Sequence, residues 1–216
     1  SFVVLLLKLS ADPLPMPVTE MFYMTPFFWI ILLLAAPIIT MRLFALEKFS
    51  GTFETLMTTP VGDMQVVMAK FFAAIFFYMV MWLPLLGYLF ILQRFNGGAT
   101  GMDAGGVGGT FLGIFLLGCL FISLGCFASS ITRSQMVAAM VSLAAGFTLF
   151  LLSFLSEQLP VVPSWATAVL AHLALFDQMH DFTRGIVDTR PVVVYLSLTF
   201  FLLFLTLRSV ESRHWK

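Results

Sequence analysis

The sequence contains little charge. Of its 216 residues, 10% are Asp, Glu, Lys or Arg, whereas 60% are hydrophobic, and the mean hydropathy is +1.02. A soluble domain carries roughly 25% charged residues, so this composition excludes an ordinary water-soluble enzyme. The formal net charge is zero, which gives no indication of a nucleic-acid partner. We therefore predict an all-α integral membrane protein in contact with the lipid bilayer.

The motifs of several enzyme classes are also missing. The sequence contains no H-E-x-x-H zinc-protease motif and no G-x-x-x-x-G-K-[ST] phosphate loop. Residues 94–109 are rich in glycine, and we interpret them as a flexible loop. No long apolar run contains Asp or Glu, which disfavours a paired-aspartate protease or a proton-coupled carrier. We predict no catalytic residue and no cofactor in this chain.

Potential metal ligands are few. The two cysteines, Cys119 and Cys126, lie in one apolar run, and we predict that they are small buried side chains. The one group with metal-ligand chemistry comprises His172, Asp177, His180 and Asp181. Asp177 and Asp181 share a helix face, but His172 must come from elsewhere. We therefore predict a solvated polar face beside the membrane and no metal site.

Uncharged apolar runs divide the chain into membrane spans. About 20 apolar residues in a helix cross a hydrocarbon core of ~30 Å. Residues 1–9 are shorter, and we interpret them as part of a first span. We predict one membrane domain over residues 1–216, a polytopic helical bundle with five complete spans at residues 21–41, 71–93, 110–132, 135–156 and 191–207.

Two segments between the spans have a distinct character. Residues 45–58 place Leu46, Phe49, Phe53 and Leu56 at helical spacing with polar residues between them, which predicts an amphipathic helix at the membrane interface. We expect its apolar face to lie against the membrane domain. Residues 157–190 are too interrupted by proline for a span, so we predict a re-entrant or interfacial segment.

Basic residues predict the orientation of the chain. Because spans alternate in direction, one side receives Arg42, Lys48, Lys70, Arg133, Arg208, Arg213 and Lys216. The other side receives Lys8, Arg94, Arg184 and Arg190. The side richer in Lys and Arg is cytosolic, so residues 45–58 are predicted inside and residues 157–190 outside.

Small residues predict where helices approach closely. Gly109, Gly113, Gly118 and Gly125 recur along residues 110–132 and its start. Ala138, Ser142 and Gly146 form a small-xxx-small face on residues 135–156. Such faces allow backbones to come together in membranes.

Two residue patterns resemble a known family. Arg42, Glu47, Gly51, Thr52, Glu54, Leu56, Thr58, Pro60 and Lys70 together resemble the ABC-2 type permeases. The pattern Phe182, Gly185, Asp188, Tyr195 and Ser197 is similar to the branch that contains the gliding-motility permease and the copper-enzyme maturation permease. The resemblance covers nearly the whole chain.

This resemblance implies the permease subunit of an ABC transporter that exports its substrate across a bacterial inner membrane. It implies six spans in the full pattern, a second permease chain in a homodimer or heterodimer, and separate ATPase subunits that bind ATP and Mg²⁺. Spans 21–41 and 135–156 would face the pathway, with Ala138, Ser142 and Gly146 as pathway or packing residues. Residues 157–190 would form an outer lid that includes Asp177, Asp181 and Arg184. Residues 45–58 would be the coupling helix, whose contacts to the ATPase are Glu47, Gly51, Thr52, Glu54 and Thr58.

Two other functions stay open at this point. A membrane scaffold or assembly factor would bind other membrane proteins without transport, and a complex without a nucleotide-binding subunit would favour it. A channel would conduct ions without ATP.

Overall fold

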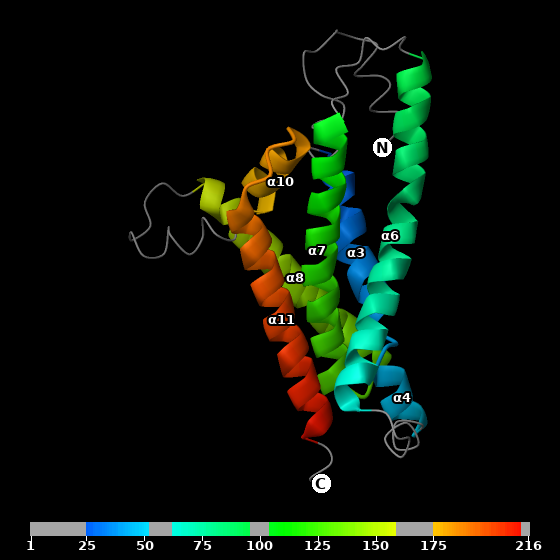
Figure 1. The fold of residues 1–216 in the computed structure, drawn as a ribbon. Coiled ribbons are helices and arrows are strands. Elements are labelled where there is room, and N and C mark those ends of the chain that lie inside the picture. Colours follow the sequence, from blue (N-terminus) through cyan, green and yellow to red (C-terminus); the bar gives the residue numbers. More distant parts are fainter. Residues whose placement is uncertain (1–24, 52–61, 96–103, 159–174, 213–216) are drawn as a thin grey trace.

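The computed structural model describes residues 25–51, 62–95, 104–158 and 175–212. Within these ranges all regular structure is helical (Figure 1). The helices are α3 (Pro26–Thr40), α4 (Ala45–Ser50), α6 (Asp63–Phe95), α7 (Ala104–Ile131), α8 (Gln135–Gln158), α10 (Leu175–Thr183) and α11 (Thr189–Glu211). Five helical segments of the described chain are long and apolar enough to cross a membrane. The predicted all-α polytopic membrane fold is confirmed, whereas the partial span at residues 1–9 lies outside the described residues.

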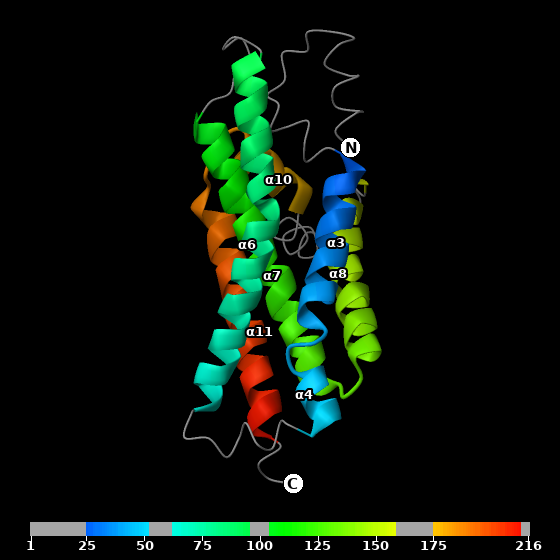
Figure 2. The ribbon, with the colours of Figure 1, turned by 90° about the vertical axis from the view of Figure 1, so that its right-hand side faces the viewer.

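Helix α7 is the centre of the bundle. Helices α3, α6, α8 and α11 all pack against it, α3 also packs against α8, and α6 packs against α11 (Figures 1 and 2). In the most apolar stretch of α7, 72% of the residues are buried, compared with 22% in α8 and in α11. The outer helices therefore present much of their apolar surface outward, as expected for helices that contact lipid.

The glycines of α7 allow its neighbours to approach. A methyl group at Gly118 would overlap the ring of Tyr78 on α6, and one at Gly125 would overlap the hydroxyl of Thr40 on α3. At Gly109 the clash would be with the backbone carbonyl of Phe182, just before the C-terminus of α10. The close approach predicted from these glycines is confirmed, and it explains why α7 is buried on several sides.

The glycine-rich segment before the third predicted span is partly helical, which corrects the predicted loop over residues 94–109. Helix α7 begins at Ala104 and includes Gly105 and Gly109. Glycine is a poor helix former in water. Here the absence of side chains lets α10 pack directly against the α7 backbone, so tertiary contact overrides the local preference.

The charge-free run expected to span the membrane begins at residue 71, and its helix, α6, begins earlier, at Asp63, the residue expected at the helix N-terminus. Lys70 therefore lies within a helix, in its second turn. Its charge marked the expected limit of the span, because charged residues avoid the hydrocarbon core.

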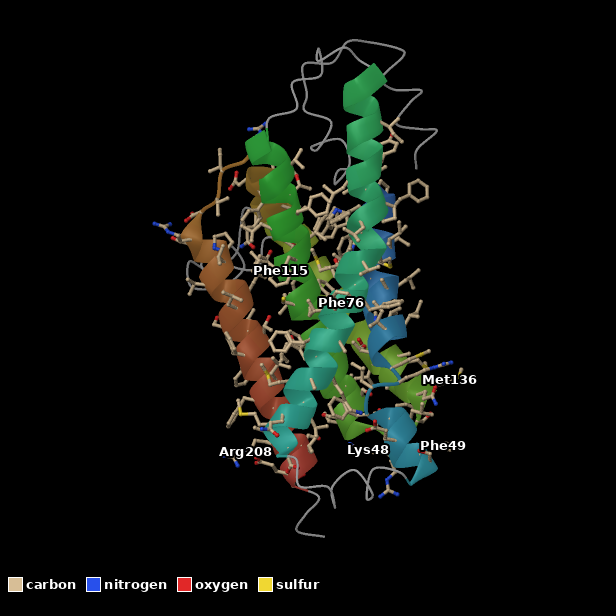
Figure 3. The ribbon with its side chains drawn as sticks, turned by 45° about the vertical axis from the view of Figure 1, so that its right-hand side comes forward. Lys48, Phe49, Phe76, Phe115, Met136 and Arg208 are labelled. Carbon is tan, nitrogen blue, oxygen red and sulfur yellow. The ribbon has the colours of Figure 1, made fainter. Side chains whose placement is uncertain are left out.

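The two ends of the bundle differ in what they carry. Helix α4, the start of α6, the turn between α7 and α8, and the C-terminus of α11 gather at one end, which we call the α4 end (Figures 1 and 2). Lys48 and Arg208 both lie there (Figure 3). Helix α10 and the starts of α7 and α11 lie at the opposite end, the α10 end.

Candidate functional site

The α4 end contains a short helix that the rest of the bundle holds in place. Helix α4 covers Ala45–Ser50, and Gly51 follows as its C-cap in the left-handed conformation, with φ 74°. Glycine adopts this conformation without the steric cost of a Cβ atom, so it is the usual residue at a helix end. The prediction of a helix that continues through Gly51 is wrong. Residues 52–61 lie outside the described residues, and with them the predicted coupling residues Thr52, Glu54 and Thr58.

The hydroxyl of Ser129, on α7, caps the N-terminus of α4. The backbone N–H groups of Phe44 and Ala45 each donate to Ser129 Oγ at 3.1 Å. The first N–H groups of a helix have no partner within it, and Phe44 and Ala45 are both 0% exposed. The hydroxyl therefore supplies an acceptor that these buried donors need, and it fixes the start of α4 on α7.

Lys48 attaches the next turn of α4 to the same part of α7. Its ammonium group donates to the carbonyl oxygen of Ser130. The hydroxyl of Ser209 on α11 donates to that oxygen as well, at 3.2 Å. The Ser130 carbonyl thus joins α4, α7 and α11 at one point.

Lys70 makes the corresponding attachment to α6. Its ammonium group donates to the carbonyl of Leu43, pairs with the Glu47 carboxylate, and lies 4.8 Å from the centroid of the Phe44 ring. The side chains of Lys70 and Glu47 are 17% and 29% exposed. Partly buried charges need such partners, because removal from water is costly when it is not compensated.

These contacts correct the expected rotation of α4. Glu47, predicted to face a partner in the cytosol, turns toward Lys70 inside the chain. Phe49, predicted to lie against the membrane domain, is 78% exposed, and Leu46 is 40% exposed. Figure 3 shows Phe49 at the tip of α4, directed away from the bundle. The reason is that the charged side chains of α4 bind a carbonyl group and an oppositely charged side chain of the neighbouring helices. The charged face of α4 therefore turns inward, and its apolar side is left outside.

The sequence interpretation missed Ser129, Ser130 and Ser209, and it did not assign a contact to Lys70. Ser129, Ser130 and Lys70 each have a weak signal in the sequence, whereas Ser209 has none. Ser129 and Ser130 adjoin each other near the end of an apolar run, and Lys70 is the single charge between Asp63 and Arg94. Their partners are more than 20 residues distant in sequence, so no local pattern identifies them.

The α10 end contains the predicted lid residues on one amphipathic helix. Asp177, Asp181 and Arg184 are exposed at i, i+4 and i+7 spacing in and just after α10. On the opposite side, Met179 and Phe182 are 1% and 2% exposed. The metal-ligand group considered above includes His172, which lies outside the described residues. Among the residues that are described, no three His, Cys, Asp or Glu side chains form a possible metal site.

The small residues of α8 face the interior of this chain. Ala138 and Ser142 are 1% and 3% exposed. A methyl group at Gly146 would lie 3.0 Å from the Phe121 ring on α7 and 3.4 Å from Leu33 on α3. The opposite side of α8 exposes large apolar side chains, among them Met136, Met140, Phe147, Leu151 and Phe154. Whether α3 and α8 line a pathway stays a prediction.

Comparison with known proteins places the chain beside a known family. Residues 8–206 match the sequence model of a family described as "ABC-2 family transporter protein". No curated protein and no solved structure matches the chain. The match covers α3 to α10 and the part of α11 up to residue 206, so Ser209 lies just beyond it.

Proposed function

The chain belongs to the ABC-2 family of transporter proteins, and we propose that it is the permease subunit of an ATP-driven exporter with separate ATPase subunits. Membership of this family makes it a multi-pass membrane transport component of an ABC transporter, which the five span-length helices fit. The finer branch, that of the gliding-motility and copper-enzyme maturation permeases, stays a prediction.

The observation that supports a coupling role is the attachment of α4 to α7 and α6, at a point where α11 also joins α7. Ser129 and Ser130 hold it on α7, Lys70 holds it on α6, and Ser209 joins α11 to the same carbonyl as Lys48. A partner that displaces α4 would therefore displace these helices as well. An interfacial helix without a coupling role would need only the burial of its apolar face to stay in place.

The surface that α4 offers to the ATPase subunit is its exposed apolar tip. Phe49 is 78% exposed, and Leu46 beside it is 40% exposed. Aromatic side chains that enter a pocket are the usual energetic centres of protein interfaces. We propose that a pocket on the ATPase receives Phe49, together with whatever residues 52–58 contribute.

ATP and Mg²⁺ would bind to the partner, because this sequence has no phosphate loop. The apolar outer faces of α3 and α8 fit a second permease chain or a hydrophobic or amphiphilic cargo. Export, the dimer and a bacterial inner membrane are the family properties that we propose for this chain.

Purification of the tagged chain from its native membrane tests the proposal. We expect a nucleotide-binding subunit to copurify and to hydrolyse ATP in the complex. A well-folded complex that contains other membrane proteins but no nucleotide-binding subunit would instead support the scaffold function. Ion conductance in bilayers without ATP would support the channel.

A further inference from the structure

Helix α7 contacts a different short helix at each of its ends, α4 at one and α10 at the other. At the α4 end, Ser129 accepts from the backbone of Phe44 and Ala45, and its hydroxyl lies 3.4 Å from the Met41 carbonyl. One turn earlier, Gly125 packs against Thr40, the last residue of α3. All of the contacted residues lie between the end of α3 and the start of α4. This junction therefore rests on the last two turns of α7.

At the α10 end the contact is between backbones. Gly109 of α7 lies against the carbonyl of Phe182, where a methyl group would overlap the oxygen. In the opposite direction, a methyl group at Gly185 would lie 2.9 Å from the carbonyl carbon of Gly105. Each segment thus contributes a glycine that packs against the backbone of the other. No side chain lies between the two backbones at this contact, so no change of rotamer could separate them.

The C-terminus of α10 has a defined, hydrogen-bonded cap. Gly185 has φ 76°, its N–H donates to the Phe182 carbonyl at 3.0 Å, and the N–H of Ile186 donates to the Asp181 carbonyl at 3.0 Å. These two bonds are the Schellman motif, which terminates a helix in one defined conformation. Met179 packs further along α7, where a methyl group at Gly113 would lie 2.8 Å from its sulfur.

We propose that α4, α7 and α10 move as one rigid body during transport. In this arrangement α10 is a fixed extension of α7 and not a hinged lid. Packed interfaces resist continuous deformation and move as units, and separation of α10 would expose Met179 and Phe182, which are almost fully buried. The proposal rests on the coupling function proposed above.

One consequence is a direct link across the membrane. Helix α7 has 28 residues, which at 1.5 Å per residue is about 42 Å. A displacement of α4 by an ATPase subunit would arrive at the exposed acidic face of α10 without an intermediate hinge. The exposed residues Asp177 and Asp181 would then report the nucleotide state at the far side of the membrane.

Distance measurements in the intact complex test this directly. Spin labels are placed at Asp181→Cys on α10 and at Ile131→Cys, at the far end of α7, where the side chain is 50% exposed. The two native cysteines are buried, and they are removed by Cys119→Ala and Cys126→Ala. We expect the same distance without nucleotide and after trapping with ADP and vanadate. A change of several ångströms in a complex whose ATPase is trapped would overturn the rigid body.

Hydrogen exchange in the purified chain tests the α7–α10 contact without any ATPase. Gly109→Ala forces a methyl group into the Phe182 carbonyl, whereas Gly108→Ala on the same helix meets nothing within 4 Å. We expect Gly109→Ala to accelerate hydrogen exchange of the amides in residues 175–183 in the purified chain, and Gly108→Ala to leave it unchanged. Equal exchange in both variants would refute the contact. Absence of a copurifying ATPase would refute the coupling function, and is distinguishable from either result.

Discussion

The hydroxyl oxygen of Ser129 lies 3.1 Å from the backbone nitrogen of Ala45, and this hydrogen bond joins residues 84 positions apart in the chain. It places the first turn of α4 on the last turn of the most buried helix of the bundle. The charged side of α4 then reaches Ser130 and Lys70, and its apolar side is left exposed.

Replacement of Ser129 by alanine leaves two buried N–H groups without their acceptor. The loss of such a partner costs about 1–3 kcal/mol. We expect Ser129→Ala to lower the melting temperature of the chain and to reduce the response of ATPase turnover to the permease. The matched control is Ser197→Ala on α11, an exposed serine whose hydroxyl donates only within its own helix. Equal melting temperatures and equal turnover for the two variants would contradict the capping role.

The contributions of Lys70 and Glu47 to the free energy of unfolding are expected to depend on each other. Lys70→Met leaves the partly buried Glu47 carboxylate without its cation, and we expect a loss of about 2 kcal/mol in the free energy of unfolding, less than for a fully buried pair because both side chains retain some exposure. The double variant Lys70→Met, Glu47→Gln removes the orphaned charge, so part of this stability should return. The check is a double-mutant cycle from denaturation measurements. Strictly additive effects would show that the two side chains do not interact.

Gly118 is expected to tolerate no side chain. A methyl group there would meet the ring of Tyr78, whose hydroxyl donates to the Ile114 carbonyl at 3.4 Å, so the ring is not free to withdraw. Alanine gains about 1 kcal/mol in helix propensity over glycine, but overpacking costs about 1–3 kcal/mol. We predict that Gly118→Ala is less stable than wild type. Gly87→Ala, with nothing within 4 Å, should be equal to it or more stable, and the opposite order would disprove the packing argument.

Much of the fold follows from the sequence, because a membrane imposes a simple rule on it. An uncharged apolar run of about 20 residues must satisfy its backbone internally and forms a helix, so the spans α3, α8 and α11 were predictable within a few residues. The glycine-rich start of α7 was not, because its helix depends on contact with Phe182 and Gly185, more than 70 residues later in the chain.

The candidate site shows the same limit. The position of α4 between two spans followed from the alternation of Leu46, Glu47 and Phe49 in the sequence. Its rotation did not, because Ser129 and Lys70 determine it from other helices. Amphipathic periodicity identifies two faces of a helix, but only tertiary contacts decide which of them is turned inward.

Labelling from outside the cell tests the orientation. The positive-inside rule places the α4 end in the cytosol. In a background without native cysteines, we expect Asp181→Cys to react with an impermeant maleimide in intact cells, and Phe49→Cys to react only after the cells are opened; both positions are exposed. Reaction of position 49 but not of position 181 in intact cells would reverse the orientation.

The affinity of the purified ATPase subunit for the chain with Phe49→Ala and with Met64→Ala tests whether α4 is the coupling element. Met64 is the control, since it is an apolar residue, 63% exposed, in the first turn of α6 at the α4 end. If Phe49 is the anchor on α4, its loss should weaken binding by roughly 2 kcal/mol, about 30-fold. Met64→Ala should bind like wild type. Wild-type affinity and ATPase turnover in the Phe49→Ala complex would contradict α4 as the coupling element.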